Sequence, residues 1–147
     1  MRRSRKRLAV VVVLAALCSG QLVRADTDAE VNARKNALDV AGAFTNDGFK
    51  LRDGHWCGMV KQQDQALIAV NLFAGNQYWF AVGTPEPGRK VAVNLYDESG
   101  KLVPTQHYEA GEHAAAGFSP TDSGQYFVAV DLELGEPTNF CLIYSYK

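Results

Sequence analysis

From residue 49 onward, hydrophobic and polar residues alternate with a period of two, which predicts β-strands. The apolar segments are short, rich in Val, Ile, Phe, Tyr and Trp, and separated by clusters of Gly, Pro, Asn and Asp. This spacing is typical of an all-β sandwich or barrel. Strands are expected near residues 56–61, 65–73, 77–83, 90–96, 101–108, 112–118, 124–131 and 138–146.

The alternation also indicates which side chains point inward. One face of three strands is wholly apolar and predicts the core: Tyr78, Phe80, Val82, Val91, Val93, Leu95, Tyr126, Val128 and Val130. The opposite faces are not polar, because they carry Trp79, Tyr96 and Phe127. Such a face needs a cover, which a preceding helix can supply. Alternatively, these three residues form an aromatic platform for a sugar ring or a partner protein.

A helix is expected over residues 27–44. Thr27 and Glu30 have the spacing of a capping box, in which the two side chains satisfy backbone N–H groups reciprocally. Apolar residues recur at spacings of seven and three, at Val31, Leu38, Ala41 and Phe44. This narrow stripe predicts one buried face. The alternative is an exported propeptide or a flexible leader, because so short a helix is marginal alone.

The first 25 residues differ from the rest in composition. A basic leader is followed by an apolar run at residues 8–18 and a polar stretch at 19–21, with Val23 and Ala25 before a cleavage point. This is the plan of a secretory signal peptide, and it predicts a periplasmic or secreted protein. The apolar run spans only about half of a bilayer, so an uncleaved anchor is the less favoured alternative. The chain then divides into a cleaved signal peptide (1–25), a helix and linker (26–48) and a β-sandwich (49–147).

Export changes how the three cysteines are interpreted. Cleavage removes Cys18 and leaves Cys57 and Cys141 in an oxidising compartment, where they are expected to form a disulfide. The alternative is a reactive or metal-bound thiol pair, but the two residues lack the local spacing of a zinc or redox motif.

Export also changes the charge. The whole chain carries 15 basic and 16 acidic residues, and six of the basic ones lie in the predicted signal peptide. The mature chain therefore has a formal charge of −7. This acidity argues against nucleic acid and anionic membrane surfaces as partners, and favours solubility or a basic partner. No membrane span is expected in the mature form.

Three segments resemble the bacterial pre-peptidase C-terminal domain: LFAGNQYWF at 72–80, VNLYDESGKLV at 93–103 and FSPTDSGQYFVAV at 118–130. The similarity covers about residues 65–146, and its motifs describe hairpin turns and core positions. The resemblance implies a jelly-roll-like antiparallel β-sandwich of about eight strands. It also implies a non-catalytic role, as an appendage of a secreted enzyme or, as expected here, as a stand-alone envelope domain.

Candidate catalytic chemistry is sparse. A nitrogen and oxygen ligand set for a metal is conceivable at His107, Glu109, Glu112 and His113, although polar residues at a hairpin tip are more often solvated. The sequence has neither the G-x-S-x-G motif of a nucleophile elbow nor a phosphate-binding glycine loop. No enzyme activity and no cofactor are therefore expected.

The sequence thus favours an exported, non-catalytic binding or structural module that holds an envelope or extracellular protein or glycan. One alternative is an accessory or inhibitor subunit that docks on a secreted enzyme. A small metal-dependent hydrolase is less favoured.

Overall fold

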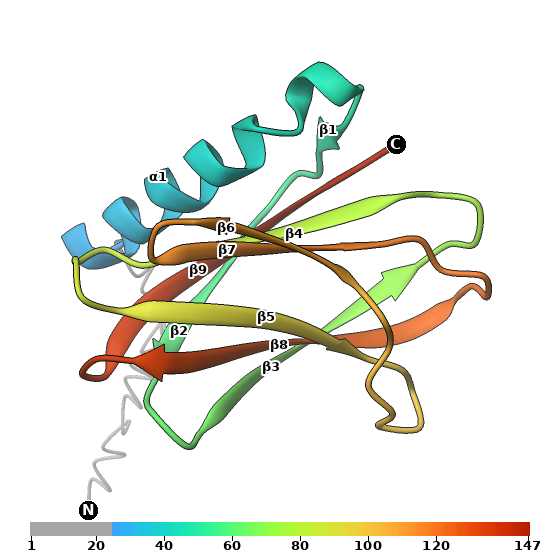
Figure 1. Cartoon of the computed structure of the whole chain (residues 1–147). Helices are drawn as coiled ribbons and strands as arrows, with labels where there is room; N and C mark the ends of the chain where they lie inside the picture. The colour runs from blue at the N-terminus through green and yellow to red at the C-terminus, as the bar shows by residue number, and fades with distance from the viewer. Residues whose placement is uncertain (1–24) are drawn as a thin grey trace, which may run out of the picture.

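A computed structural model describes residues 25–147 and shows two antiparallel sheets packed together, with one helix outside them (Figure 1). Apart from Ala25, the predicted signal peptide lies outside the described residues. The elements are α1 (Asp28–Gly42), the 3-10 turn η1 (Thr45–Asp47), β1 (Lys50–Leu51), β2 (Trp56–Val60), β3 (Gln65–Leu72), β4 (Tyr78–Gly83), β5 (Lys90–Tyr96), β6 (Gln106–Ala110), β7 (His113–Phe118), β8 (Gly124–Leu134) and β9 (Thr138–Tyr146).

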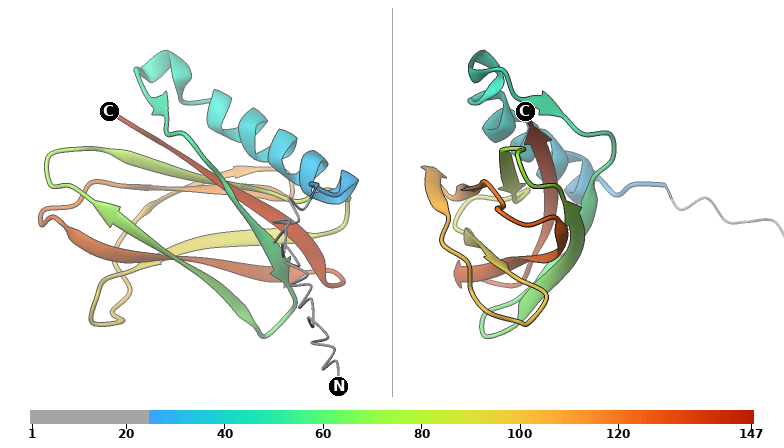
Figure 2. Two further views of the ribbon diagram at one scale, coloured as in Figure 1. Left: turned by 180° about the vertical axis from the view of Figure 1, so that it is seen from behind. Right: turned by 90° about the vertical axis from the view of Figure 1, so that its right-hand side faces the viewer.

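The strands divide unequally between the sheets. Sheet A has the order β1-β9-β4-β7-β6, and β2 also pairs with β9. Sheet B has the order β3-β8-β5. Viewed from behind and from the side, the two sheets form two layers, and α1 covers the outer face of sheet A (Figure 2).

The strand expected at 101–108 is wrong in its first half. Residues 101–105 form no strand apart from an isolated bridge between Leu102 and Tyr96, and β6 begins at Gln106. Pro104 lacks the N–H that a ladder requires, and the chain crosses here from β5 in sheet B to β6 in sheet A. The short strand β1 was not expected, and β8 extends to Leu134.

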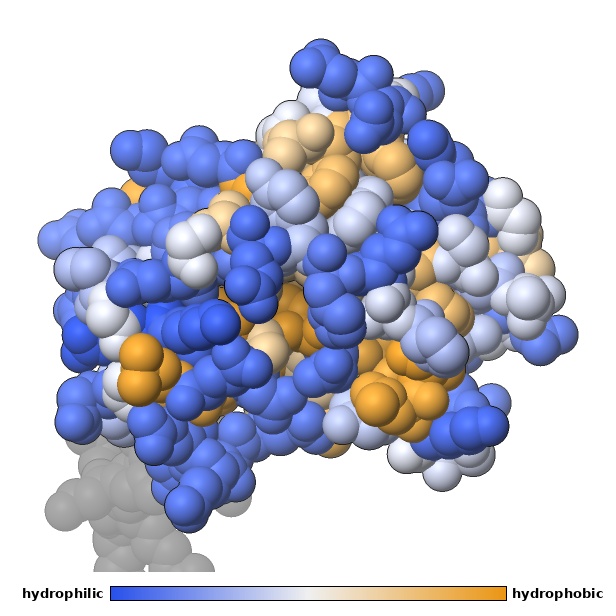
Figure 3. Space-filling view, in the orientation of Figure 1, coloured by the Kyte–Doolittle hydropathy of each residue, from blue (hydrophilic) through white to orange (hydrophobic). Residues whose placement is uncertain are grey.

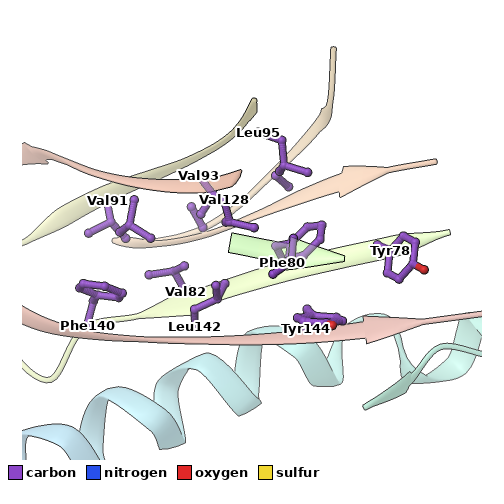
Figure 4. Close-up of a cluster of buried hydrophobic side chains, with 14 of the residues drawn as sticks. Tyr78, Phe80, Val82, Val91, Val93, Leu95, Val128, Phe140, Leu142 and Tyr144 are labelled. Carbon is purple, nitrogen blue, oxygen red and sulfur yellow. The ribbon is translucent and has the colours of Figure 1, made fainter. Parts of the chain in front are cut away.

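The predicted core is confirmed. All nine inward residues are buried and belong to one hydrophobic cluster between the sheets. In Figure 4, Val91, Val93, Leu95 and Val128 of sheet B face Phe80, Val82 and their neighbours of sheet A. Since alternate residues of a strand share a face, the period of two was sufficient to identify this cluster.

The capping box at the start of α1 is also confirmed. The Glu30 N–H donates to Thr27 Oγ1 over 3.2 Å, and the Thr27 N–H donates to Glu30 Oε2 over 2.9 Å. The predicted stripe is wrong at two positions, because Val31 and Leu38 are 42% and 41% exposed. The buried residues of the helix are instead Ala33, Ala37, Val40 and Ala41.

Gly83 explains why small residues form the buried face of α1 at its contact with β4. A Cβ at this position would lie only 2.6 Å from the Ala33 carbonyl oxygen, so the helix backbone rests directly on the end of β4. Small side chains at Ala33 and Ala37 permit this approach, and both are completely buried. The predicted stripe is therefore correct at Ala41 and Phe44 and fails at the two large residues, because the contact with β4 depends on alanine and glycine.

The predicted disulfide between Cys57 and Cys141 is present. The two residues lie directly opposite each other in β2 and β9. Their separation of 84 residues means that the bond joins the first long strand of the sandwich to its last.

Candidate functional site

Trp79, one of the three predicted platform residues, lies under the helix. The Phe44 ring stacks on the Trp79 ring, with centroids 4.0 Å apart and planes 8° from parallel. A Cβ on Gly117 would lie 2.9 Å from the indole, so glycine leaves room for the ring on β7. Trp79 therefore packs within the contact between α1 and sheet A, which supplies the cover that its face required.

Tyr96 and Phe127, the other two platform residues, lie on the outer face of sheet B. They are directly opposite each other in β5 and β8, and Ala69 of β3 lies opposite Phe127 on the other side. Leu67, which lies in the next row of the same face, is 57% exposed. The structure thus brings two platform residues together and places the third on the other sheet.

Polar side chains on the same face are tied together. Gln65 Nε2 donates to Asp131 Oδ1 over 3.0 Å, and Asn94 Nδ2 donates to Asp131 Oδ2 over 3.3 Å. Gln65 Nε2 also lies 3.5 Å from the Tyr96 hydroxyl. Two amides from the flanking strands therefore hold the Asp131 carboxylate beside the aromatic pair.

We call this surface the sheet B face, formed by Gln65, Leu67, Asn94, Tyr96, Phe127 and Asp131. A shallow hollow of about 450 Å³ lies over its aromatic end and is bounded by the turn at residues 98–100. Aromatic rings provide apolar contact area, and fixed amide and carboxylate groups orient a ligand that carries hydroxyls. The face can therefore accept a ring with one apolar side and polar edges.

A second aromatic surface was missed in the sequence. The strands β2 and β3 diverge (Figure 2). A cleft of about 580 Å³ is lined by residues of both sheets in this region. We call it the β2–β3 cleft, and its lining includes Arg52, Trp56, Phe73, Tyr78, Tyr144 and Tyr146. Alternation identifies the face of each side chain but gives no sign that two consecutive strands diverge, so the sequence held no clear signal for it.

The deep wall of the β2–β3 cleft is a stack of rings. The Trp56 and Tyr144 rings are 9° from parallel with centroids 5.6 Å apart. The Arg52 guanidinium lies 5.1 Å from the Tyr144 ring and 5.7 Å from the Trp56 ring. Burial raises the pKa of the Tyr144 hydroxyl, and the positive charge of Arg52 partly opposes this. The phenol is therefore protonated and neutral at neutral pH.

The four candidate metal ligands, for which a solvated hairpin tip was the favoured interpretation, do not converge. Glu109 lies 3.7 Å from Lys90 Nζ, and Glu112 Oε1 accepts a hydrogen bond from the Gly88 N–H. His107 lies opposite Ala116, whose side chain points into the core, so the two share the inner face of sheet A. His113 precedes Ala114, which also points into the core, so His113 lies on the outer face and points toward the helix. Within residues 25–147, no three His, Cys, Asp or Glu side chains are placed to hold a metal ion.

His113 has a structural role instead. Its Nδ1 accepts a hydrogen bond of 3.3 Å from the backbone N–H of Thr84, at the start of the loop after β4. Burial lowers the pKa of the imidazole, although the negative charges of Glu112 and Asp39 partly oppose this shift. The neutral ring therefore fits this site, because a proton on Nδ1 would oppose the Thr84 N–H.

A further hollow of about 630 Å³ lies among the loops at one end of the sandwich. Asp97 borders it, but its carboxylate is already used. Asp97 Oδ1 accepts hydrogen bonds from the hydroxyl and N–H of Ser99 and from the N–H of Lys101. These bonds lower the pKa of Asp97 and hold the turn after β5, so we assign this residue a structural role.

No helix among residues 25–147 is long and apolar enough to cross a membrane. Comparison of the sequence with models of known protein families gave no match. Comparison with curated proteins also gave no match.

Proposed function

We propose that this protein is an exported, non-catalytic β-sandwich module of the cell envelope or exterior that holds a glycan on the sheet B face. The observation that carries the proposal is the Tyr96–Phe127 pair lying beside Asp131, whose carboxylate is held by two amides. A sugar ring presents C–H groups on one side, which pack on an aromatic ring, and hydroxyls at its edge, which bond to fixed carboxylate and amide groups.

Export is supported by two independent features. The first 25 residues have the pattern of a secretory signal peptide, and the Cys57–Cys141 disulfide is a bond that persists in oxidising compartments. A formal charge of −7 after cleavage favours solubility there.

The strand order supports a jelly-roll-like sandwich. From β2 to β5, consecutive strands alternate between the two sheets, and β9 returns to the middle of sheet A beside β2 and β4. Crossing of this kind between two sheets is typical of jelly rolls. It agrees with the sequence resemblance to the pre-peptidase C-terminal domain, which is likewise non-catalytic, and we propose a stand-alone member of that type.

Binding of the exported protein to an array of purified envelope and extracellular polysaccharides tests the glycan proposal. Any polysaccharide retained on the array is then titrated by calorimetry with the wild type, Tyr96→Ala, Phe127→Ala and Asp131→Asn. Each substitution is expected to weaken binding about tenfold or more, which corresponds to about 1.4 kcal/mol. His107→Ala is the matched control, because it removes an exposed ring on β6 in the other sheet.

Two results would overturn the proposal. One is the absence of binding to every polysaccharide tested by a folded, disulfide-bonded protein. The other is binding that His107→Ala weakens as much as Tyr96→Ala does, since the ligand would then not lie on the sheet B face. Circular dichroism of each variant separates lost binding from lost folding.

A further inference from the structure

One edge of sheet B is left open by the fold. Within residues 25–147, β3 pairs with β8 alone, so alternate N–H and C=O groups along its other side have no partner strand. Figure 2 shows β3 running along the side of the molecule and diverging from β2. Hollows of about 390 and 580 Å³ lie beside its two ends, so there is room along this edge.

Two other sheet edges, those formed by β5 and β6, are protected. Near its two ends, β5 is bonded to neighbouring segments, since Val91 N–H donates to the Glu112 carbonyl and Val103 N–H donates to the Leu95 carbonyl. The edge strand β6 has five residues and carries the charge of Glu109. The side of the molecule with β5 and β6 is mainly hydrophilic, with apolar side chains in small separate patches (Figure 3).

The β3 edge has none of these protections. Its eight residues, QALIAVNL, include no charged residue and no proline. Of the nine exposed large apolar residues in the described part of the chain, four lie on β3 or line the hollows beside it: Met59, Leu67, Phe73 and Tyr146. A long, uncharged edge strand with exposed apolar residues beside it can pair with another strand.

The sequence of β3 identifies the strand that fits. When two copies of β3 run antiparallel with Ile68 opposite Ile68, residues 67 and 69 lie opposite each other, as do 66 and 70 and 65 and 71. The pairs are then Leu with Ala, Ala with Val and Gln with Asn, all on matching faces. The polar residues meet at the ends, and the apolar residues meet in the middle.

Charge also favours self-pairing at this edge. Each copy carries a formal charge of −7 over the described residues, so most surfaces of two copies repel each other. Pairing of two β3 strands places no like charges opposite each other, because β3 has no charged residue.

We propose that the protein forms a two-fold dimer in which the β3 strands of two copies pair antiparallel. The two Ile68 residues lie opposite each other across the two-fold axis. The two copies of sheet B then form one six-stranded sheet. Both sheet B faces lie on the same side of it, so a dimer presents two Tyr96–Phe127 pairs to the same surface. The dimer rests on the edge of β3 and not on the glycan proposal.

Two double variants test the pairing and its register. Leu67→Lys with Ala69→Lys places lysine opposite lysine twice in the dimer, whereas Leu67→Glu with Ala69→Lys places glutamate opposite lysine twice. Both variants put two charges on exposed positions of the same strand. Analytical ultracentrifugation over a wide concentration range should show a wild-type dimer. We expect at least about tenfold weaker association for the double lysine variant and restored, salt-sensitive association for the mixed variant.

Cross-linking provides a second measurement of the register. With Ile68→Cys, the two thiols lie opposite each other and should form an intermolecular disulfide on mild oxidation. With Ala66→Cys, the two copies of the residue lie four positions apart along the pair, roughly 13 Å, and should not. A wild type that stays monomeric at all concentrations would overturn the dimer, whatever polypeptide the edge then binds. Equal weakening by both charged variants, or cross-linking of the Ala66→Cys protein and not of the Ile68→Cys protein, would overturn this interface.

Discussion

The close contact between α1 and Gly83 allows a direct test of how the helix packs on sheet A. We predict that Gly83→Ala destabilises the domain, because the new methyl group has no space. An ideal Cβ would lie 2.6 Å from the Ala33 carbonyl oxygen and 2.8 Å from the Asn36 carbonyl carbon. These are backbone atoms, which cannot rotate away as the end of a side chain can. Either the helix moves outward or the end of β4 shifts.

The magnitude follows from the cost of overpacking. Inserting a methyl group into a filled site costs about 1–3 kcal/mol, and contact with backbone places this change at the upper end, about 3 kcal/mol. The unfolding entropy of a domain of about 120 residues is about 0.25 kcal/mol/K, so the melting temperature should fall by about 12 °C. Outward movement of α1 would also expose Ala33 and Ala37, which are now completely buried.

Gly42→Ala is the matched control, since it makes the same chemical change in the helix itself. A Cβ at Gly42 has nothing within 4 Å, and the backbone there is helical. We expect no loss of stability and a gain of up to about 1 kcal/mol. Calorimetry gives the melting temperatures, and hydrogen exchange of residues 28–42 reports whether the helix is seated. A Gly83→Ala protein that matches the wild type in both measurements would refute the close contact between the helix and β4.

Two further predictions concern His113 and the disulfide. The pKa of His113 is lower in the folded protein than in the unfolded chain, where it is about 6.5. As the pH falls below about 6.5, His113 is therefore protonated first in the unfolded chain. The free energy of unfolding then decreases until the pH reaches the folded pKa. His113→Gln, whose side-chain oxygen can accept from the Thr84 N–H, should lack this component in urea titrations at pH 8 and 5.5; parallel pH dependence in both proteins would contradict the assignment. Replacing Cys57 and Cys141 with serine should lower the free energy of unfolding by about 4–5 kcal/mol through chain entropy, and an unchanged urea midpoint would contradict this estimate.

The core could be predicted from the sequence because it depends on local periodicity. Tyr78, Phe80 and Val82 alternate within one strand, and nothing beyond the strand is needed to place them on one face. The disulfide was equally accessible, since the part of the chain after the predicted signal peptide has two of the three cysteines, which permit only one pairing. The capping box between Thr27 and Glu30 involves neighbouring residues, and it too was visible before the fold was known.

The sequence-based predictions failed where the structure depends on how helices and strands far apart in the sequence pack against each other. The close contact of α1 with Gly83 involves a residue far along the chain, so burial was wrongly expected at Val31 and Leu38. The same stripe was correct at Ala41 and Phe44. The aromatic platform was assembled from strands of different sheets, because alternation gives the face of a residue but not its sheet. Trp79 therefore lies under Phe44, while Tyr96 and Phe127 share the sheet B face.

The position of β9 has a consequence for how the protein is made. β9 lies between β4 on one side and β1 and β2 on the other, and it also carries Cys141. Residues 138–146 are synthesised after every other strand described here, so sheet A cannot close until they emerge. A nascent chain is therefore kept from forming its completed sheet and its disulfide during most of its synthesis. This delay fits the export that we propose, because the polypeptide would cross a membrane before its sheet A closes.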